Sequence, residues 1–300
     1  MGAMSSDAIL PAIHARLAAA LATPHPRYRP FVVDGAALGA LDDARADRLR
    51  RFPALAVSTA QVAFAPLLAR AAAAERSAAL ADVALTLRAE GALPAWRDEL
   101  YAVAPAFGAP AAFLLERGAA RWFGVRTYAA HVNGATVRAG RTHLWFSRRS
   151  PAKAVDPGML DNLVGGGIAA GAGVRATVVR EAWEEAGIAA HVAARAQAAG
   201  VVHVRRALPD GLQDEVVFVH DLALPDDFVP ANQDGEAVEH RLVDAAAAAR
   251  LIAVATGADA VTVDASLVVL DFLLRHGAFT SDAPAYAEAS ALRLASMPLA

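Results

Sequence analysis

The stretch that decides the fold of this chain is Arg180-Glu181-Ala182-Trp183-Glu184-Glu185-Ala186-Gly187-Ile188, which follows Gly165-Gly166-Gly167 after a short gap. On a helix, Glu181, Glu184 and Glu185 stand at i, i+3 and i+4, so their carboxylates share one face. Like charges at these offsets repel by about 0.2–0.5 kcal/mol per pair on an isolated helix, which calls for a compensating cation. Mg²⁺ prefers oxygen ligands and is usually completed by waters and substrate phosphates. The three glutamates therefore predict a magnesium site, with Mn²⁺ as the second candidate ion.

The other face of this helix is largely apolar and can pack against a sheet. It carries Val178, Val179, Ala182, Trp183 and Ala186. For three glutamates taken alone, the alternative interpretation is a solvated acidic face on a surface helix.

Length and composition are those of a globular protein. The chain has 300 residues, of which 56% are hydrophobic, enough for one large domain or two ordinary ones. Its 28 Lys and Arg against 31 Asp and Glu leave a formal charge of −3, which gives no sign of a nucleic-acid surface. We therefore expect a small-molecule partner and no nucleic acid.

The sequence lacks cysteine and long apolar runs. With no cysteine, disulfides, thiolate metal sites and cysteine nucleophiles are excluded, which is typical of a reducing compartment. No charge-free run of about 18 apolar residues occurs, so we expect no membrane span. Met1 to Asp7 lack the basic and apolar pattern of a signal peptide. These observations predict a cytoplasmic protein.

The predicted secondary structure changes after Glu116. Before it, the patterns predict a helix at 8–22, a strand at 31–33 followed by a turn at Asp34-Gly35, and alanine-rich helices at 42–51 and 64–91. After it, β-type runs at 120–125, 129–132, 136–137, 143–146, 199–204 and 216–222 surround a helix at 175–186, with a further helix at 265–276. We therefore expect a smaller α+β domain over 1–120 and a mixed α/β domain over 121–300.

The glycine run and the acidic helix together match a known motif. Gly166, Arg180, Glu181, Glu184, Glu185 and Gly187 fall at the offsets of the Nudix box, Gly-x5-Glu-x7-Arg-Glu-U-x-Glu-Glu-x-Gly-U, where U is a bulky apolar residue. Two positions depart from it, because the first glutamate falls on Ala172 and Ala182 is small for a U position. The resemblance implies a C-terminal Nudix fold, a mixed sheet between helices, and hydrolysis of a phosphoanhydride bond.

Segments outside the box point to one Nudix subgroup. They are 96–101, 131–134, 147–150, Lys153, 157–162, 234–236 and 271–277. They resemble the subgroup that includes the Nudix domain related to fungal thiamine pyrophosphokinase. This resemblance implies an N-terminal domain of unknown role and hydrolysis of oxidised thiamine diphosphate to the monophosphate. Members of the subgroup often vary the first box glutamate, so Ala172 removes one ligand without excluding a metal site.

The catalytic residues are expected on the acidic helix and one loop. Glu181, Glu184 and Glu185 would bind Mg²⁺, which neutralises charge on the diphosphate and lowers the pKa of a bound water. Phosphoryl transfer needs mainly positioning and charge stabilisation, so no protein nucleophile is required. Arg180 would orient a glutamate, or form a plain surface salt bridge. Glu236 would bind metal or act as general base, or belong to a solvated turn.

The candidate substrate-binding residues include Gly166 and Gly167 of the glycine run. Further candidates precede this run in the sequence. Arg148, Arg149 and Lys153 could clamp phosphate oxygens, because a guanidinium fork matches them, or could form a basic strand end.

Further candidates could contact the substrate ring. His131 and Asn133 lie near an expected strand end and could touch the heterocycle, or could be structural. Tyr101 or Trp96 could stack on the substrate base, or could form a contact between domains.

Three functions stay open at this stage. The first is hydrolysis of a thiamine-diphosphate-like compound, and the second is hydrolysis of a nucleoside diphosphate derivative, because the box says little about the leaving group. The third is a catalytically silent module that senses a ligand. The alanine at position 172, where the box has its first glutamate, allows this alternative. A homodimer is compatible with the alanine-rich first third, although no residue pattern identifies an interface.

Overall fold

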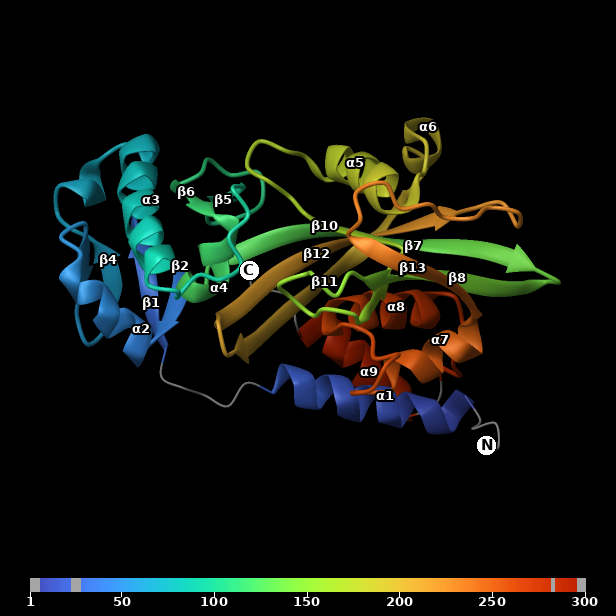
Figure 1. Cartoon of the computed structure of the whole chain (residues 1–300). Helices are drawn as coiled ribbons and strands as arrows, with labels where there is room; N and C mark the ends of the chain where they lie inside the picture. Colours follow the sequence, from blue (N-terminus) through green and yellow to red (C-terminus); the bar gives the residue numbers. More distant parts are fainter. Residues whose placement is uncertain (1–5, 23–27, 282–283, 296–300) are drawn as a thin grey trace.

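The computed structural model describes residues 6–22, 28–281 and 284–295, in which a long curved sheet lies between two layers of helices beside a smaller unit (Figure 1). We call residues 28–125 the smaller unit, and residues 6–22 with 126–295 the larger unit. Residues 1–5, part of the segment considered above for a signal peptide, lie outside the described residues. In the described ranges no helix is long and apolar enough to cross a membrane.

The smaller unit is a four-stranded sheet and a hairpin packed on one long helix. The sheet has the order β2-β1-β4-β3, from β1 (Tyr28–Val33), β2 (Ala36–Asp42), β3 (Leu55–Val57) and β4 (Val62–Phe64). The hairpin joins β5 (Leu100–Val103) and β6 (Phe113–Glu116), and the helices are α2 (Asp43–Arg48), α3 (Ala73–Ala89) and α4 (Ala120–Phe123). Short 3₁₀ helices cover Leu49–Arg51, Leu68–Arg70 and Arg117–Ala119. The expected turn after β1 is present, since Asp34 and Gly35 both have positive φ, 52° and 82°.

Two predictions for this unit are wrong. Helix is predicted from residue 64, but α3 begins at Ala73, because Val62 and Phe64 are buried strand residues and Pro66 has no N–H for a helix. The strand predicted at 120–125 is α4, a single turn. Gly124 ends that turn in the left-handed conformation with φ 58°, and its missing Cβ lets Ala40 approach.

The larger unit is built on a mixed sheet. Its order is β11-β12-β7-β8-β13, from β7 (Arg126–Arg138), β8 (Arg141–Arg149), β11 (Gln197–Leu208), β12 (Gly211–Ala223) and β13 (Ala237–Asp244). Two short strands extend it: β9 (Leu160–Asn162) pairs with β8, and β10 (Val164–Gly167) pairs with β7. The pairing of β12 with β7 is parallel, whereas the other strand pairs of this sheet are antiparallel. The predicted α/β class is therefore confirmed.

Helices cover both faces of this sheet (Figure 1). One face carries α5 (Val174–Ala186) and α6 (Ala190–Ala193), and the other carries α1 (Ser6–Leu21), α7 (Ala245–Ile252), α8 (Val263–Arg275) and α9 (Pro284–Ala295). The helices predicted at 8–22, 175–186 and 265–276 are therefore present as α1, α5 and α8.

The first helix belongs to the core of the larger unit. Ile13 and Leu17 of α1 are fully buried in the cluster that also holds Val268 of α8. Arg16 anchors α1 to α7 and α8, because its Nη1 donates to the carbonyl oxygen of Ile252 at 2.6 Å and to Oγ of Ser266 at 2.8 Å. The division at residue 120 stays a prediction, but by packing α1 lies with the elements that follow it.

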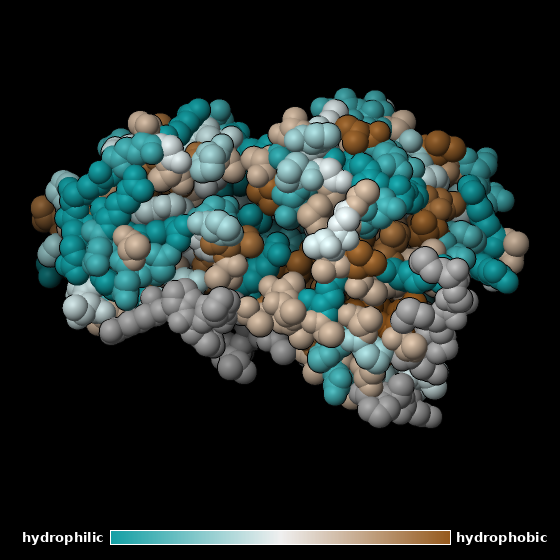
Figure 2. Space-filling view, turned by 60° about the horizontal axis from the view of Figure 1, so that its bottom comes forward, coloured by the Kyte–Doolittle hydropathy of each residue, from teal (hydrophilic) through white to brown (hydrophobic). Residues whose placement is uncertain are grey.

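The two units also differ in the surface that they present. In Figure 2 the smaller unit, on the left, is mainly hydrophilic, whereas hydrophobic patches gather on the larger unit, on the right.

Candidate active site

The acidic helix α5 turns two of its three glutamates inward. Glu181 and Glu185 are buried beside Val178, whereas the side chain of Glu184 is 35% exposed. Trp183, expected on the packed face, is 53% exposed, because the helix is rotated so that the carboxylates of residues 181 and 185 lie toward the sheet. Two like charges are thus held at a partly enclosed place, which is costly without a compensating charge.

The glycine run of β10 makes room for three different neighbours. A Cβ on Gly166 would lie 2.0 Å from Oε1 of Glu181, and one on Gly165 would lie 3.0 Å from the His131 ring. A Cβ on Gly167 would lie 2.0 Å from the hydroxyl of Tyr101. No real Cβ tolerates contacts of 2.0 Å, so the glycines allow the carboxylate and the phenol to lie against the strand.

Hydrogen bonds orient the glutamates. Arg180 donates from Nη2 to Oε1 of Glu181 at 2.6 Å and from Nη1 to Oε2 of Glu184 at 2.7 Å. The backbone N–H of Gly165 donates to Oε2 of Glu185 at 2.8 Å. Burial raises the pKa of Glu185 to about 8, and the charge of Glu181 adds to the rise. Burial likewise raises the pKa of Glu181, although Arg180 opposes it.

A loop closes the C-terminal end of α5 and carries Glu236. Gly187 caps the helix with φ 65°. The last carbonyl oxygens of α5 then accept hydrogen bonds from N–H groups outside the helix, with Gln233 N to Glu184 at 2.7 Å, Ala231 N to Ala186 at 3.0 Å and His240 Nε2 to Glu185 at 3.0 Å. The segment 231–236 is therefore held at the helix end, which places Glu236 near the site.

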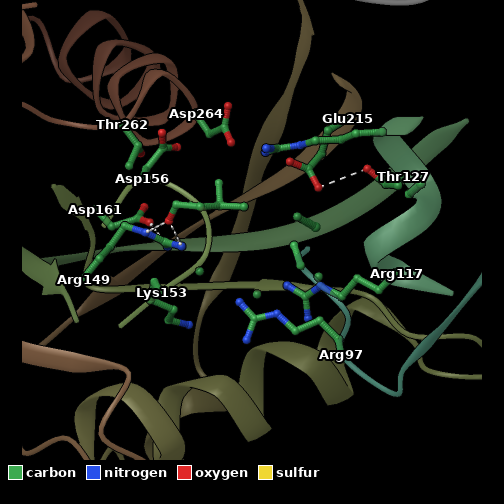
Figure 3. A pocket seen from close by; sticks show the side chains of 18 of the residues that line it. Arg97, Arg117, Thr127, Arg149, Lys153, Asp156, Asp161, Glu215, Thr262 and Asp264 are labelled. Atoms are coloured by element: carbon green, nitrogen blue, oxygen red, sulfur yellow. Dashed lines mark hydrogen bonds and ion pairs between the residues drawn. The ribbon is translucent and has the colours of Figure 1, made fainter. Parts of the chain in front are cut away.

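A cavity of about 180 Å³ lies in front of these residues. Its wall includes the side chains of Glu181 and Glu236, of the cations Arg97, Arg117, Arg121, Arg149 and Lys153, and of the acids Asp156, Asp161, Asp210, Glu215 and Asp264. Figure 3 shows Arg97 and Arg117 reaching into the same space as Lys153, with Asp156 and Asp264 on the opposite side. The cavity thus presents a cationic side and an acidic side to one ligand.

Two family models match this chain, one after the other. Residues 127–263 match the NUDIX domain, and residues 14–127 match a domain of unknown function (DUF4743). The C-terminal part of the chain is a Nudix domain. The Nudix box of the sequence lies within it, on β10 and α5.

Two curated relatives of this chain carry Nudix names. The chain is 44% identical over 212 residues to Nudix hydrolase 24, chloroplastic, and 42% identical over 212 residues to Nudix hydrolase 20, chloroplastic, both from Arabidopsis thaliana. These alignments cover 71% of this chain and 57% and 56% of the two relatives, so the chain spans about half the length of the curated relatives that it matches. The predicted Nudix fold of the C-terminal domain is confirmed. Both relatives are named chloroplastic, which contradicts the expected cytoplasmic location.

Solved structures resemble the Nudix domain more distantly. The Nudix domain of Shewanella oneidensis NrtR, in complex with ADP ribose, is 12% identical with a TM-score of 0.41 and covers 51% of this chain and 90% of that chain.

The structure brings most, but not all, of the predicted site residues to the cavity of the Nudix domain. Lining it are Glu181, Glu236, Arg149, Lys153, His131, Gly166 and Gly167. Lys153 pairs with Glu236, and Arg149 donates to Oδ2 of Asp161 at 2.8 Å.

Two predicted substrate-binding residues lie elsewhere. Arg148 donates to Oε2 of Glu239 at 2.5 Å and to Oδ1 of Asp259 at 2.9 Å, on the side of β8 away from the cavity. Successive residues of a strand point to opposite faces, so Arg148 and Arg149 could not both face the substrate. Asn133 is buried and donates to Oδ1 of Asp221 at 3.0 Å, so it belongs to a polar network beneath the site.

Several cavity residues carried no signal that sequence reasoning used. Asp161 stands three positions before β10, in a segment singled out only by resemblance. Arg117 comes from the smaller unit, 64 positions before Glu181 in the numbering, so spacing could not connect them. Trp96 does not line the cavity; its Nε1 donates to Oδ1 of Asp98 at 2.6 Å, whereas Tyr101 does line it.

The site fits a divalent ion through two carboxylates. Across the residues that the structure describes, no three His, Cys, Asp or Glu side chains are grouped closely enough to hold a metal by themselves. Glu181 and Glu185 nevertheless offer hard oxygen donors, and burial, followed by the charge of Glu181, raises the pKa of Glu185, so that a bound cation would favour its ionised form. Mg²⁺ is commonly held by one or two carboxylates together with substrate phosphates. Glu184, bonded to Arg180, stays a predicted ligand.

Proposed function

We propose that this chain is a metal-dependent Nudix diphosphatase that hydrolyses a phosphoanhydride bond in a small diphosphate compound. The observation that carries the proposal is the buried carboxylate of Glu181 at a cavity that Lys153 enters from another side, with buried Glu185 bonded to Gly165 of the cavity wall. A diphosphate group is the kind of ligand that needs both a cation held by carboxylates and a positively charged wall.

The chemistry follows from the charges around the cavity. When bound at Glu181 and Glu185, a divalent ion would neutralise diphosphate charge and make water more acidic. Lys153 would hold phosphate oxygens, while Arg180 and the Gly165 N–H keep the glutamates oriented. Water adds to one phosphorus and the bridging oxygen leaves with the other, so a monophosphate and inorganic phosphate form. Glu236, beside Lys153, is the proposed acceptor of the water proton.

For the substrate, we propose a thiamine-diphosphate-like compound, in particular an oxidised form. Support comes from the subgroup resemblance in the sequence and from the acidic side of the cavity. Asp156 and Asp264 lie across from Arg97 in Figure 3, where they could accept hydrogen bonds from an exocyclic amine. An aminopyrimidine carries such an amine, but so do adenine and cytosine, so a direct comparison of substrates is required.

The deciding experiment is an assay of phosphate release from thiamine diphosphate, its oxidised forms and a nucleotide panel, each with Mg²⁺, Mn²⁺ or chelator. We expect metal-dependent release from the oxidised thiamine compounds. Release from nucleotides alone would keep the hydrolase and remove the thiamine assignment. No release from any compound would favour the ligand-sensing module instead.

A substitution in the carboxylate pair tests the site itself. Glu185→Gln keeps the shape of the side chain but removes its charge, so we expect kcat to fall by about 100-fold or more, as for loss of one strong electrostatic group. The exposed Glu75→Gln on α3 is the matched control and should leave kcat unchanged. Full activity in Glu185→Gln would remove this residue from the mechanism.

A further inference from the structure

One wall of the cavity comes from the smaller unit. Arg97, Tyr101 and Arg117 line it together with the backbone at Ala95 and Gly118, facing the carboxylates and Lys153 of the Nudix domain. Arg97 and Arg117 enter the space from the segments that flank the β5–β6 hairpin (Figure 3). A ligand in this cavity therefore meets both units.

Direct contacts hold this hairpin against the Nudix domain. The N–H of Ala170, just after β10, donates to the carbonyl oxygen of Leu100 in β5 at 2.8 Å. The hydroxyl of Tyr101 fills the space that a side chain at Gly167 would occupy. The wall is therefore attached to the same glycine run against which Glu181 lies, and its arginines keep a defined position relative to that carboxylate.

Arg97 is positioned by its backbone while its side chain stays available. Its N–H donates to Oε1 of Glu116 at 2.8 Å, and the same oxygen accepts from Gly118 N at 3.2 Å. Glu116 is buried, so this bond fixes the loop. The guanidinium makes one long ion pair, 3.9 Å from Nη1 to Oε1 of Glu236, and no shorter one is recorded among the described residues. A guanidinium so placed has donors left for a ligand.

Arg117 lies behind Arg97 and is anchored at one end of its fork. Nη1 donates to Oε2 of Glu99 at 2.6 Å, and the guanidinium carbon lies 5.6 Å from the ring centre of Tyr101. The remaining donors of the fork face the cavity, where Figure 3 shows them beside the tip of Arg97. The two guanidinium groups therefore form one cationic patch.

The positive charge of this patch reaches the Nudix side of the cavity. The pKa of Lys153 is lowered, first by burial and then by the charges of Arg149, Arg97 and Arg117, against the opposing effect of Glu185. Four cations of both units thus act on one small volume, and a diphosphate would relieve their repulsion.

We propose that Arg97 and Arg117 of the smaller unit bind the phosphate group of the substrate that lies farther from Glu181, so that both units together form the diphosphate site. Planar guanidinium groups match phosphate oxygens in pairs, which lysine cannot do. The assignment of a diphosphate ligand rests on the proposed function, whereas the anion site can be tested without turnover.

The test is calorimetric binding of methylenediphosphonate, a diphosphate analogue that water does not cleave, to the full chain with Mg²⁺. We expect Arg97→Gln to weaken binding by about 10- to 100-fold, as for loss of a charge-assisted bond pair. Arg97→Lys should fall between Arg97→Gln and the unaltered protein, because it keeps the charge but loses the fork. Arg70→Gln, an exposed arginine of the same unit, is the control and should bind as the unaltered protein does.

The remaining outcomes distinguish failure of the two-unit site from failure of the proposed hydrolase function. Equal binding by Arg97→Gln and the unaltered protein, equal weakening by Arg70→Gln, or no binding by the unaltered protein overturns the two-unit site. Arg117→Gln should weaken binding as Arg97→Gln does. If Arg117→Gln fails to fold, the result for Arg97→Gln alone decides. If binding depends on Arg97 yet no diphosphate is hydrolysed, the proposed function fails and the anion site stands.

Discussion

Single residues in β10 decide where the carboxylate of Glu181 lies. Of the three consecutive glycines, the Nudix box singles out Gly166, and the structure shows Glu181 occupying the space beside it. The glutamate is the movable partner of this contact, because its carboxylate ends a flexible side chain. A side chain at residue 166 should therefore displace the carboxylate more than it unfolds the protein.

For Gly166→Ala we expect kcat/KM to fall by about 100-fold, since a displacement of about 1 Å at a reacting group can cost that much. Thermal unfolding should show a modest loss of stability, about 1–3 kcal/mol, because overpacking is partly relieved by movement of Glu181. Gly173→Ala is the control, because nothing lies within 4 Å of an added Cβ there. Near-normal activity in Gly166→Ala would show that the position of Glu181 is not critical.

At this scale the sequence predicted the identity of the carboxylates better than their environment. Helical spacing predicts one shared face for Glu181, Glu184 and Glu185, and the structure turns the first and the last of them inward but leaves Glu184 partly exposed. Spacing says nothing about how the helix is rotated against a sheet, so the burial of Glu185 and the exposure of Trp183 could not be predicted. Strand alternation could have separated Arg148 from Arg149, had their strand been assigned with its full length.

Among the elements, α5 depends on a left-handed glycine at its end. Gly187 and Gly91 both follow a helix with positive φ, 65° and 74°, but an added Cβ would meet Ala231 O at 2.8 Å only at Gly187. We expect Gly91→Ala to lose about 1–2 kcal/mol from the left-handed conformation. Gly187→Ala should lose a further 1–3 kcal/mol, roughly, from the collision. Urea unfolding of both variants measures the difference, and equal losses would exclude a role for the loop contact.

A chain of hydrogen bonds links β7 to α8. His131 donates to Asn162 Oδ1 at 2.8 Å, Asn133 donates to Asp221 at 3.0 Å, and Arg275 of α8 donates to the same carboxylate at 2.6 Å. Burial alone would raise the pKa of Asp221, but the bonds from Arg275 and Asn133 outweigh it and lower the pKa. The floor of the cavity is thus connected to the helix on the other face of the sheet.

This network should make stability depend on acid pH. Because the folded-state pKa of Asp221 is lower than its unfolded value of about 3.9, its contribution is present above that pH and is lost as pH falls through the folded-state pKa. Asp221→Asn should cost about 1–2 kcal/mol at pH 7 and less at pH 3. Urea unfolding at both pH values, with the exposed Asp227→Asn as control, measures this. A cost that is the same at both pH values would contradict the assignment.

The elements themselves were predicted with uneven success, for physical reasons. Long strands such as β7 were expected as two short runs, because Asn133 and Gly134 interrupt the apolar pattern, although Asn133 is satisfied within the network. Parallel pairing of β12 with β7 joins residues 88 positions apart, from Asp214 with Arg126 onward, and local patterns carry no information about such pairs.

On the scale of the whole molecule, the first helix stabilises elements that lie far along the chain. Leu17→Ala should lower the free energy of unfolding by about 2–5 kcal/mol, because this fully buried side chain of α1 fills the core under α8. Leu85→Ala on α3 removes the same atoms from a side chain that is 50% exposed, and should change stability by less than about 0.5 kcal/mol. Urea unfolding compares the two, and similar losses would mean that α1 contributes little to the core.

The complete cavity is likewise a property of the whole molecule. Composition and motifs predicted a Nudix domain and a separate first domain, but not that Arg97 and Arg117 of the first would face Glu181 of the second. Their meeting depends on the docking of β5 beside the segment after β10, which involves residues about 70 positions apart.

The placement of α1 also bears on how such proteins can recombine. The chain leaves the larger unit after α1 and returns to it at β7. In three dimensions the smaller unit, residues 28–125, is therefore an insertion into the larger unit and not a separate N-terminal domain. A chimera joined near residue 120 would combine the α1 of one parent with the core of another, whose side chains were selected around a different helix. An exchange of residues 28–125 alone would keep each core intact. This segment is therefore the unit that evolution or an engineer could replace to change the cavity wall contributed by the smaller unit.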